Sequence, residues 1–466
     1  MLFSSLTFLY LFLPIVLIVY FLVPKNWKNG VLLLASLVFY FFGERAYTAL
    51  MVLASLSGYV HGLLIDRFRG RVLSKVFLIS SLVVGLGMLV YFKYTDFFLS
   101  NINLLLGTEI PLLRVIMPIG ISFFTFQILS YTIDVYRGKA KVQKNFFRLA
   151  TYVSLFPQLI AGPIVRYTTV AEELDHRTHS VSDAAYGTVR FLIGLGKKVL
   201  IANQLGAFVE VFRNAAEPTV LFYWLYAVAY TLQIYFDFSG YSDMAIGLGR
   251  IFGFHFLENF NYPFISSSVT EFWRRWHISL GTWFRDYVYI PLGGNRVKLP
   301  RHLFNIFVVW MITGFWHGAN WNFILWGLFF AVFLIAEKLT KKYFERIPRV
   351  LRHIYLLLIV VISFVLFNAT SLNECIRDLG GMFGFGGLPF SGSETLYYLK
   401  SYAVLFLVAV VGSTPLCKRC VEELRKRPNG KTALSVLTPV FAAVLLLVVT
   451  AYLVDGGFNP FLYFRF

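Results

Sequence analysis

The sequence is poor in charged residues and in cysteine. Only 14% of its 466 residues are Asp, Glu, Lys or Arg, against about 25% in an average soluble domain, so a soluble globular fold is excluded. The cysteines are Cys375, Cys417 and Cys420, and the Cys417–Cys420 pair has no second pair or histidine cluster nearby. No zinc or redox site is therefore expected.

Long apolar runs take the place of the missing charge. Hydrophobic residues make up 58% of the chain, and runs such as 6–23 and 440–454 show no alternation of polar and apolar residues. A bilayer helix needs about 20 apolar residues, whereas an outer-membrane barrel shows short alternating strands. The pattern predicts an all-α polytopic membrane protein with about twelve spans, at 6–23, 30–43, 47–65, 75–92, 112–135, 186–205, 219–236, 302–317, 321–337, 353–368, 399–413 and 433–454.

The excess of positive charge lies between these runs. Lys and Arg total 42 against 24 Asp and Glu, a net charge of +18. The positive-inside rule explains this excess without a nucleic-acid partner, because basic loops stay in the cytoplasm. Four basic clusters, at 67–75, 137–148, 338–352 and 418–431, all become cytoplasmic when the first span is retained and begins outside. Both termini are then predicted to be extracytoplasmic.

Three stretches fit poorly as simple spans. Leu149–Val165 is broken by Pro157 and by Gly162-Pro163, and Tyr241–Phe254 carries charged residues and glycines. Irregular or charged backbone survives at membrane depth only inside the protein or beside a wet cavity, so both are predicted to be re-entrant elements. The aromatic and arginine-rich stretch His255–Arg301 is predicted to be an amphipathic region on the cytoplasmic membrane surface, in contact with lipids.

Polar residues concentrate between Gln233 and Asn322, and an ionisable residue in an apolar segment is by default a functional candidate. His317 is the most informative, because it lies between two apolar runs, beside Trp316, Gly318 and Asn320. An imidazole accepts a proton near neutral pH. The alternative is a structural histidine bonded to a carbonyl at a helix end, and the residues alone leave both interpretations open.

His277 follows two arginines, Arg274 and Arg275. Arginine pairs bind phosphate through forked donors, so they suit either a phosphate-bearing acyl donor or lipid head groups. Three acidic residues are expected to have a structural role, in which they pair with these arginines: Asp237, Asp243 and Glu271.

Beyond single residues, an ordered set of motifs resembles the membrane-bound O-acyltransferase superfamily, and within it the alginate O-acetylation branch more than the teichoic acid D-alanylation branch. The resemblance extends over nearly the whole length. The motifs that carry it are 1–5, 91–94, 118–123, 131–138, 156–163, 235–249, 271–280, 284–295, 316–320 and 463–466.

The resemblance implies a single membrane domain over 1–466, in which 11–13 helices and re-entrant elements surround a funnel and the catalytic window covers about 233–337. It implies that His317 is the principal catalytic residue and that His277 supports it or the donor. The remaining expected site residues bind the phosphates of the donor or orient its carbonyl: Arg274, Arg275 and Lys298 for the phosphates; Trp316, Asn320 and Asn261 for the carbonyl.

The implied reaction takes an acetyl group from cytoplasmic acetyl-CoA to an acceptor outside a bacterial inner membrane, for O-acetylation of a polysaccharide. No metal or tightly bound cofactor is expected. By analogy the acceptor is a separate protein related to the serine (SGNH) hydrolases, since the predicted outer loop at 368–399 is too short for a domain. Transfer of D-alanyl from a phosphopantetheine carrier, transport of a polyprenyl-linked sugar and a purely structural role are the alternatives.

Overall fold

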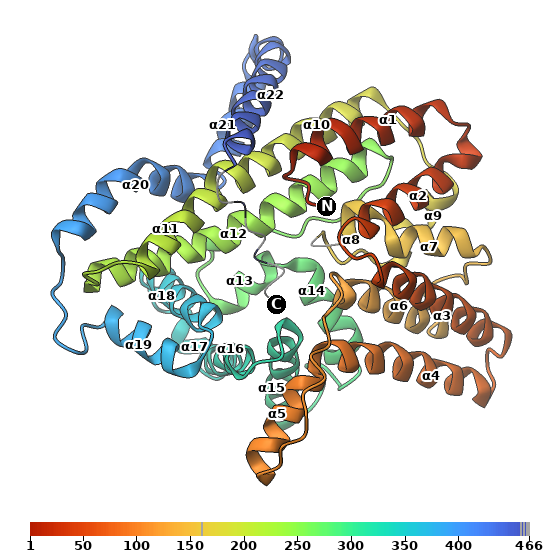
Figure 1. Ribbon diagram of the computed structural model, residues 1–466, viewed down its shortest axis with the longest axis horizontal. Helices are drawn as coiled ribbons and strands as arrows, with labels where there is room; N and C mark the ends of the chain where they lie inside the picture. The colour runs from red at the N-terminus through yellow and green to blue at the C-terminus, as the bar shows by residue number, and fades with distance from the viewer. Residues whose placement is uncertain (160–161, 457–458, 460–461, 463–466) are drawn as a thin grey trace. The chain divides into compact units, whose positions relative to one another are not determined.

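The protein is helical throughout the part that the structure describes. A computed structural model describes residues 1–159, 162–456, 459 and 462, and it contains no strand within these ranges (Figure 1). The chain forms two compact units, one of residues 1–191 with 242–257 and the other of residues 192–241 with 258–466. The prediction of an all-α polytopic membrane protein is confirmed.

The first unit is built mainly from the N-terminal helices. Its helices α3 (Tyr47–Arg67), α4 (Val72–Leu89) and α6 (Ile121–Tyr136) pack against one another, and Figure 1 shows them side by side in brown and orange. It also contains the start of α10 (Val181–Gly196) and the end of α12 (Val220–Ile251). The other helices of this unit are α1 (Leu13–Leu22), α2 (Lys28–Phe41), α5 (Thr95–Leu106), α7 (Phe146–Ser154), α8 (Phe156–Leu159) and α9 (Tyr167–Asp175).

The second unit holds most of the predicted catalytic window. Helix α15 packs along α16, which also contacts α18, and the three lie side by side in Figure 1. A hydrophobic core rich in aromatic side chains joins α11 and α12 to α13, α16 and α18. The helices of the second unit are α11 (Asn203–Arg213), α13 (Val269–Arg275), α14 (Ile278–Phe284), α15 (Leu299–His317), α16 (Trp321–Leu339), α17 (Lys341–Phe344), α18 (Arg349–Asn368), α19 (Leu372–Met382), α20 (Ser393–Gly412), α21 (Leu416–Lys426) and α22 (Gly430–Val454).

Each of the twelve predicted apolar runs contains a helix, although the run at 112–135 becomes helical only at Ile121. Among the described residues, seven helical segments are long and apolar enough to cross a membrane, and Phe8–Leu22 is a shorter apolar one. The seven are Tyr47–Arg67, Val72–Leu106, Val181–Arg213, Trp321–Leu339, Arg349–Asn368, Ser393–Gly412 and Gly430–Val454.

Two of the three irregular stretches differ from expectation. Tyr241–Phe254 was expected to break, but α12 continues without interruption to Ile251, because Asp243 is paired with Arg190 and so needs no cavity. In His255–Arg301, the rings of Phe272, Trp276 and Trp283 are buried in the protein. These aromatics therefore form protein core instead of a membrane-surface layer.

The stretch Leu149–Val165 is interrupted as predicted, since α7 ends at Ser154 and α8 begins at Phe156. Residues 160–161 of this stretch, and the motif at 463–466, lie outside the described residues.

Candidate active site

His317 is the last residue of α15, and a close helix contact sets its position. Gly314 and Gly327 bring α15 and α16 together: a Cβ atom on Gly314 would lie 2.3 Å from the carbonyl oxygen of Phe323. One on Gly327 would lie 2.2 Å from the carbonyl oxygen of Trp310. Small residues allow such an approach between membrane helices. The chain then turns at 318–320, and α16 begins at Trp321.

Three aromatic rings surround the half-buried imidazole of His317. The ring centroids of Trp316 and Trp326 each lie 5.0 Å from it, and that of Phe367 lies 5.3 Å away. All three meet the imidazole nearly at right angles. We call these three residues the aromatic cage. It limits the access of water to the ring and so strengthens polar interactions made there.

His277 also lies near Trp316, whose ring centroid is 6.3 Å from the centroid of the His277 imidazole. His277 is only 2% exposed, and the ring of Phe238 packs against it. Its Nδ1 is 3.2 Å from Oδ1 of Asn259. Burial lowers the pKa of His277 to about 3, because a charged imidazole is poorly solvated there. The structure thus gathers both predicted histidines and Trp316 in one place.

The other predicted site residues are spread over this unit. Asn320 donates from Nδ2 to the carbonyl oxygen of Thr370, at 3.3 Å, and so holds the chain just after His317. Arg274 and Lys298 are exposed. Asn261 is also exposed, and its carbonyl oxygen accepts a hydrogen bond from Arg275. Asn261 is therefore placed beside the arginine pair.

The expected pairing of acidic residues with Arg274 and Arg275 is correct for one residue of three. Glu271 contacts Arg275 at 3.0 Å. Asp237 instead pairs with buried Lys198 at 2.5 Å, and Asp243 pairs with Arg190 as described above. The two exceptions lie on the long helix α12, where helices distant in sequence supply the partners.

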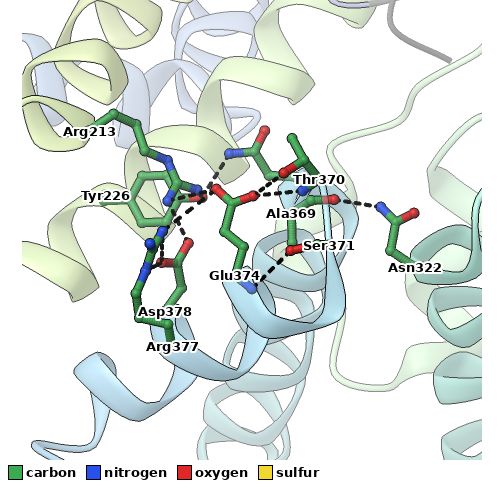
Figure 2. A network of polar contacts seen from close by, with 10 residues as sticks. Arg213, Tyr226, Asn322, Ala369, Thr370, Ser371, Glu374, Arg377 and Asp378 are labelled. Carbon is green, nitrogen blue, oxygen red and sulfur yellow. Dashed lines mark hydrogen bonds and ion pairs between the residues drawn. The ribbon is translucent and has the colours of Figure 1, made fainter. Parts of the chain in front are cut away.

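A polar network that no sequence argument above pointed to lies at residues 369–371, the corner that joins α18 to α19 (Figure 2). Arg213 on α11 contacts Glu374 at 3.1 Å and Asp378 at 2.7 Å. Glu374 in turn accepts hydrogen bonds from the backbone and hydroxyl of Thr370. Ser371 caps α19 by accepting from the Glu374 backbone. The spacing Ser371-x-x-Glu374 is that of a capping box, a signal that could have located this corner from sequence.

The network fixes the corner at residues 369–371, which follows Phe367 of the aromatic cage along the chain. Asn322, at the start of α16, donates from Nδ2 to the carbonyl oxygen of Ala369 at 2.7 Å, and Figure 2 shows it reaching the corner from the side opposite to Arg213. Phe367, two residues before Ala369, packs on His317. The corner is therefore held between the ion pairs of Arg213 and the asparagines that follow His317.

Comparison with known proteins shows the family of the chain. The membrane-bound O-acyltransferase profile matches residues 137–376, a range that includes both histidines. A probable alginate O-acetylase AlgI from Azotobacter vinelandii is 38% identical over 501 aligned positions, with 100% of both chains covered. The chain belongs to the membrane-bound O-acyltransferase family. A peptidoglycan O-acetyltransferase from Helicobacter pylori is 34% identical, with 90% of this chain and 88% of the relative covered.

A more distant relative of this O-acyltransferase is a teichoic acid D-alanyltransferase from Bacillus subtilis, 31% identical over 58% of this chain and 69% of the relative. Membership of the family identifies the protein as a multi-pass membrane enzyme, in preference to the transporter and scaffold alternatives. Among the described residues of the acyltransferase, no group of three or more His, Cys, Asp or Glu is placed to hold a metal ion.

Proposed function

We propose that this O-acyltransferase moves an acetyl group from cytoplasmic acetyl-CoA to a hydroxyl group on an extracytoplasmic acceptor, and that His317 is the general base. One observation carries the proposal: His317 ends α15 inside the aromatic cage, and Trp316 of that cage also lies near the His277 ring. The relatives named as O-acetylating enzymes support acetyl as the acyl group.

The proposed chemistry needs one proton acceptor at the reacting atoms. The acceptor hydroxyl oxygen attacks the thioester carbonyl carbon, the C–O bond forms and the C–S bond breaks. His317 takes the hydroxyl proton and returns it to the leaving thiolate, so the products are the acetyl ester and free coenzyme A. The aromatic cage excludes water, which would otherwise hydrolyse the thioester. His277, Trp316 and Asn320 position the reactants.

Helix α15 is not among the seven apolar segments given above for the described residues, and the support that it lends to transfer across the membrane comes from its length and from the charges near its start. The helix has 19 residues, from Leu299 to His317, and therefore rises about 27 Å, close to the ~30 Å hydrocarbon thickness of a bilayer. Lys298 precedes its start, and α16 returns to the basic cluster that begins at Lys338. The positive-inside rule places that end in the cytoplasm. Exposed Lys298 and Arg274, with Arg275, would bind the phosphates of the donor there, while its acyl arm extends along the proposed funnel toward His317.

The acceptor follows from the relatives by analogy. We propose that a separate extracytoplasmic protein, of the SGNH hydrolase type, receives the acetyl group and modifies an exported or cell-wall polysaccharide, and that the enzyme resides in a bacterial inner membrane with both termini outside. The match to a teichoic acid D-alanyltransferase supports one second candidate, in which the donor is a D-alanyl group on a phosphopantetheine carrier.

The test supplies purified enzyme in proteoliposomes with radiolabelled acetyl-CoA or, in a parallel reaction, with a radiolabelled D-alanyl carrier. The proposal expects release of coenzyme A and label on a hydroxyl acceptor only with acetyl-CoA, and loss of both in His317→Ala. Transfer only from the D-alanyl carrier would show that the carrier, and not acetyl-CoA, is the donor. Full activity of the His317→Ala variant would refute the role of His317.

A further inference from the structure

The best-defined polar contact near the proposed reaction centre involves Asn259, which the sequence analysis did not single out as a site residue. Asn259 is fully buried. Its backbone carbonyl oxygen accepts from the backbone N–H of Ile278 at 2.9 Å, which fixes the segment at 259 beside the start of α14. This places the Asn259 side chain against both His277 and Ser279.

The orientation of the Asn259 amide is determined by Ser279. Oδ1 of Asn259 lies 3.2 Å from the backbone nitrogen of Ser279 and 2.8 Å from its Oγ. A backbone N–H is only a donor, so the side-chain atom that faces it must be the amide oxygen. The same oxygen lies 3.2 Å from Nδ1 of His277. Oγ of Ser279 also lies 3.4 Å from Nδ1, but its single proton is donated to Oδ1 of Asn259 in the much shorter contact. Because the amide oxygen only accepts hydrogen bonds, the geometry favours a proton on Nδ1 of His277.

The tautomer determines what the other ring nitrogen does. A neutral imidazole has one N–H, so Nε2 of His277 carries a lone pair and acts as an acceptor. Nε2 is buried and has no hydrogen-bond partner in the described part of the chain. A buried acceptor without a partner is costly, and a residue at φ 45° is held there only by its surroundings. Both features are typical of a functional position.

We infer that Asn259 is a positioning residue that holds His277 in the Nδ1–H tautomer, so that Nε2 accepts a hydrogen bond from an O–H or N–H group of a bound substrate. The inference rests on the proposed function for the identity of that substrate. Two groups of the reaction have this chemistry: the acceptor hydroxyl and the amide N–H groups of the pantetheine arm. The inference excludes one role for neutral His277, since a lone pair cannot stabilise a developing oxyanion.

The first test reads the tautomer directly and needs no activity. Enzyme labelled with ¹⁵N-histidine is compared with His277→Asn to assign the His277 signals. We expect a protonated Nδ1 and an unprotonated Nε2 in the native enzyme and in Ser279→Ala, which keeps the backbone N–H that orients Asn259. Asn259→Ala should lose this preference. A protonated Nε2 in the native enzyme would overturn the inference, even if acetyl transfer proceeds as proposed.

The second test measures kinetics with a matched control. Asn305 is also fully buried, but its amide donates to the carbonyl oxygens of Leu292 and Gly294. Asn259→Ala should lower kcat/KM for acetyl transfer by about 10-fold to 100-fold, whereas Asn305→Ala should leave kcat/KM per folded protein unchanged. A rise in KM for acetyl-CoA identifies the pantetheine amide as the donor to Nε2, and a fall in kcat alone identifies the acceptor hydroxyl.

Asn259→Asp keeps the accepting oxygen and should retain the Nδ1–H proton that Asn259→Ala loses. This variant guards against a folding defect in Asn259→Ala, because its tautomer can be read in any folded fraction. Equal kinetics of Asn259→Ala and Asn305→Ala, with an unchanged tautomer in both, would contradict the inference. Loss of acetyl transfer in every variant including Asn305→Ala, with the expected tautomers, would contradict the kinetic prediction alone.

Discussion

His317 and His277 both lie near Trp316, but their surroundings differ. His317 is half-buried at the end of a helix, and three aromatic rings lie around it. His277 is almost fully buried, and an asparagine oxygen orients its Nδ1. Under the proposed function, this difference corresponds to a division of labour, in which His317 transfers the proton and His277 presents a fixed lone pair.

The largest expected effect comes from removing the two imidazoles separately. His317→Ala should lower kcat by about 10²–10⁴-fold, the usual contribution of a general base. His277→Ala should lower it by about 10-fold to 100-fold, because it removes one hydrogen bond to substrate and leaves the base in place. Steady-state acetyl transfer, with folded protein measured by size-exclusion chromatography, tests the ranking. A larger loss in His277→Ala would reverse the comparison.

The helix contact that positions His317 is tested by Gly314→Val. The new side chain would collide with the carbonyl oxygen of Phe323, so we expect overpacking to cost about 1–3 kcal/mol of unfolding free energy, together with a loss of activity from the displaced imidazole. Gly87→Ala is the control, because a Cβ there meets nothing within 4 Å. Thermal unfolding in detergent measures both variants, and equal melting temperatures would show that the close contact does not matter.

The polar network around Arg213 and Glu374 should contribute to the stability of the folded protein. Glu374→Gln removes a partner of Arg213 and should cost about 1–3 kcal/mol. The control Glu345→Gln breaks an exposed pair with Lys341 at 3.8 Å and should cost less than about 0.5 kcal/mol. Chemical unfolding of each variant against the native enzyme measures the difference. A loss of unfolding free energy as small as that of Glu345→Gln would show that the network does not stabilise the corner at residues 369–371.

The same carboxylate gives a pH dependence with a definite sign. Burial acts to raise the pKa of Glu374, but hydrogen bonds from Thr370 and the charge of Arg213 outweigh it and lower the pKa overall. A lowered pKa in the folded state stabilises the protein above the ordinary value of about 4.3, and that contribution disappears as the pH falls through the lowered pKa. Native enzyme should therefore lose more stability than Glu374→Gln between about pH 5 and pH 3, measured by unfolding at each pH.

The smallest effect is expected at the entrance proposed for the donor. Arg274→Ala should raise the KM for acetyl-CoA by about 3-fold to 10-fold, less so at high salt, because an exposed arginine binds phosphate through a screened charge. Arg425 on α21 is also exposed, and Arg425→Ala should leave this KM unchanged. An equal change in both variants would indicate a general effect of surface charge.

The apolar runs and the charge pattern were sufficient to predict the helices and the membrane class, because hydrophobic length is a local property of the chain. They also made His317 conspicuous as a polar residue between two apolar runs, whereas His277 was selected because it follows two arginines. That both histidines take part in the reaction stays a prediction. The partners of Asp237 and Asp243 were mispredicted, because helix packing brings Lys198 and Arg190 to them from other segments. Asn259 was overlooked for the same reason, as its role depends on a contact with a residue 18 positions away.

Sidedness of the reaction tests the central claim most directly. Sealed vesicles of one orientation receive labelled acetyl-CoA only on the side of Lys298, and the hydroxyl acceptor is present only on the other side. We predict that the native enzyme labels the acceptor across the membrane, and that His317→Ala binds acetyl-CoA with similar affinity but transfers nothing. Transfer by His317→Ala at the native rate, or labelling only when donor and acceptor share one side, would contradict the account.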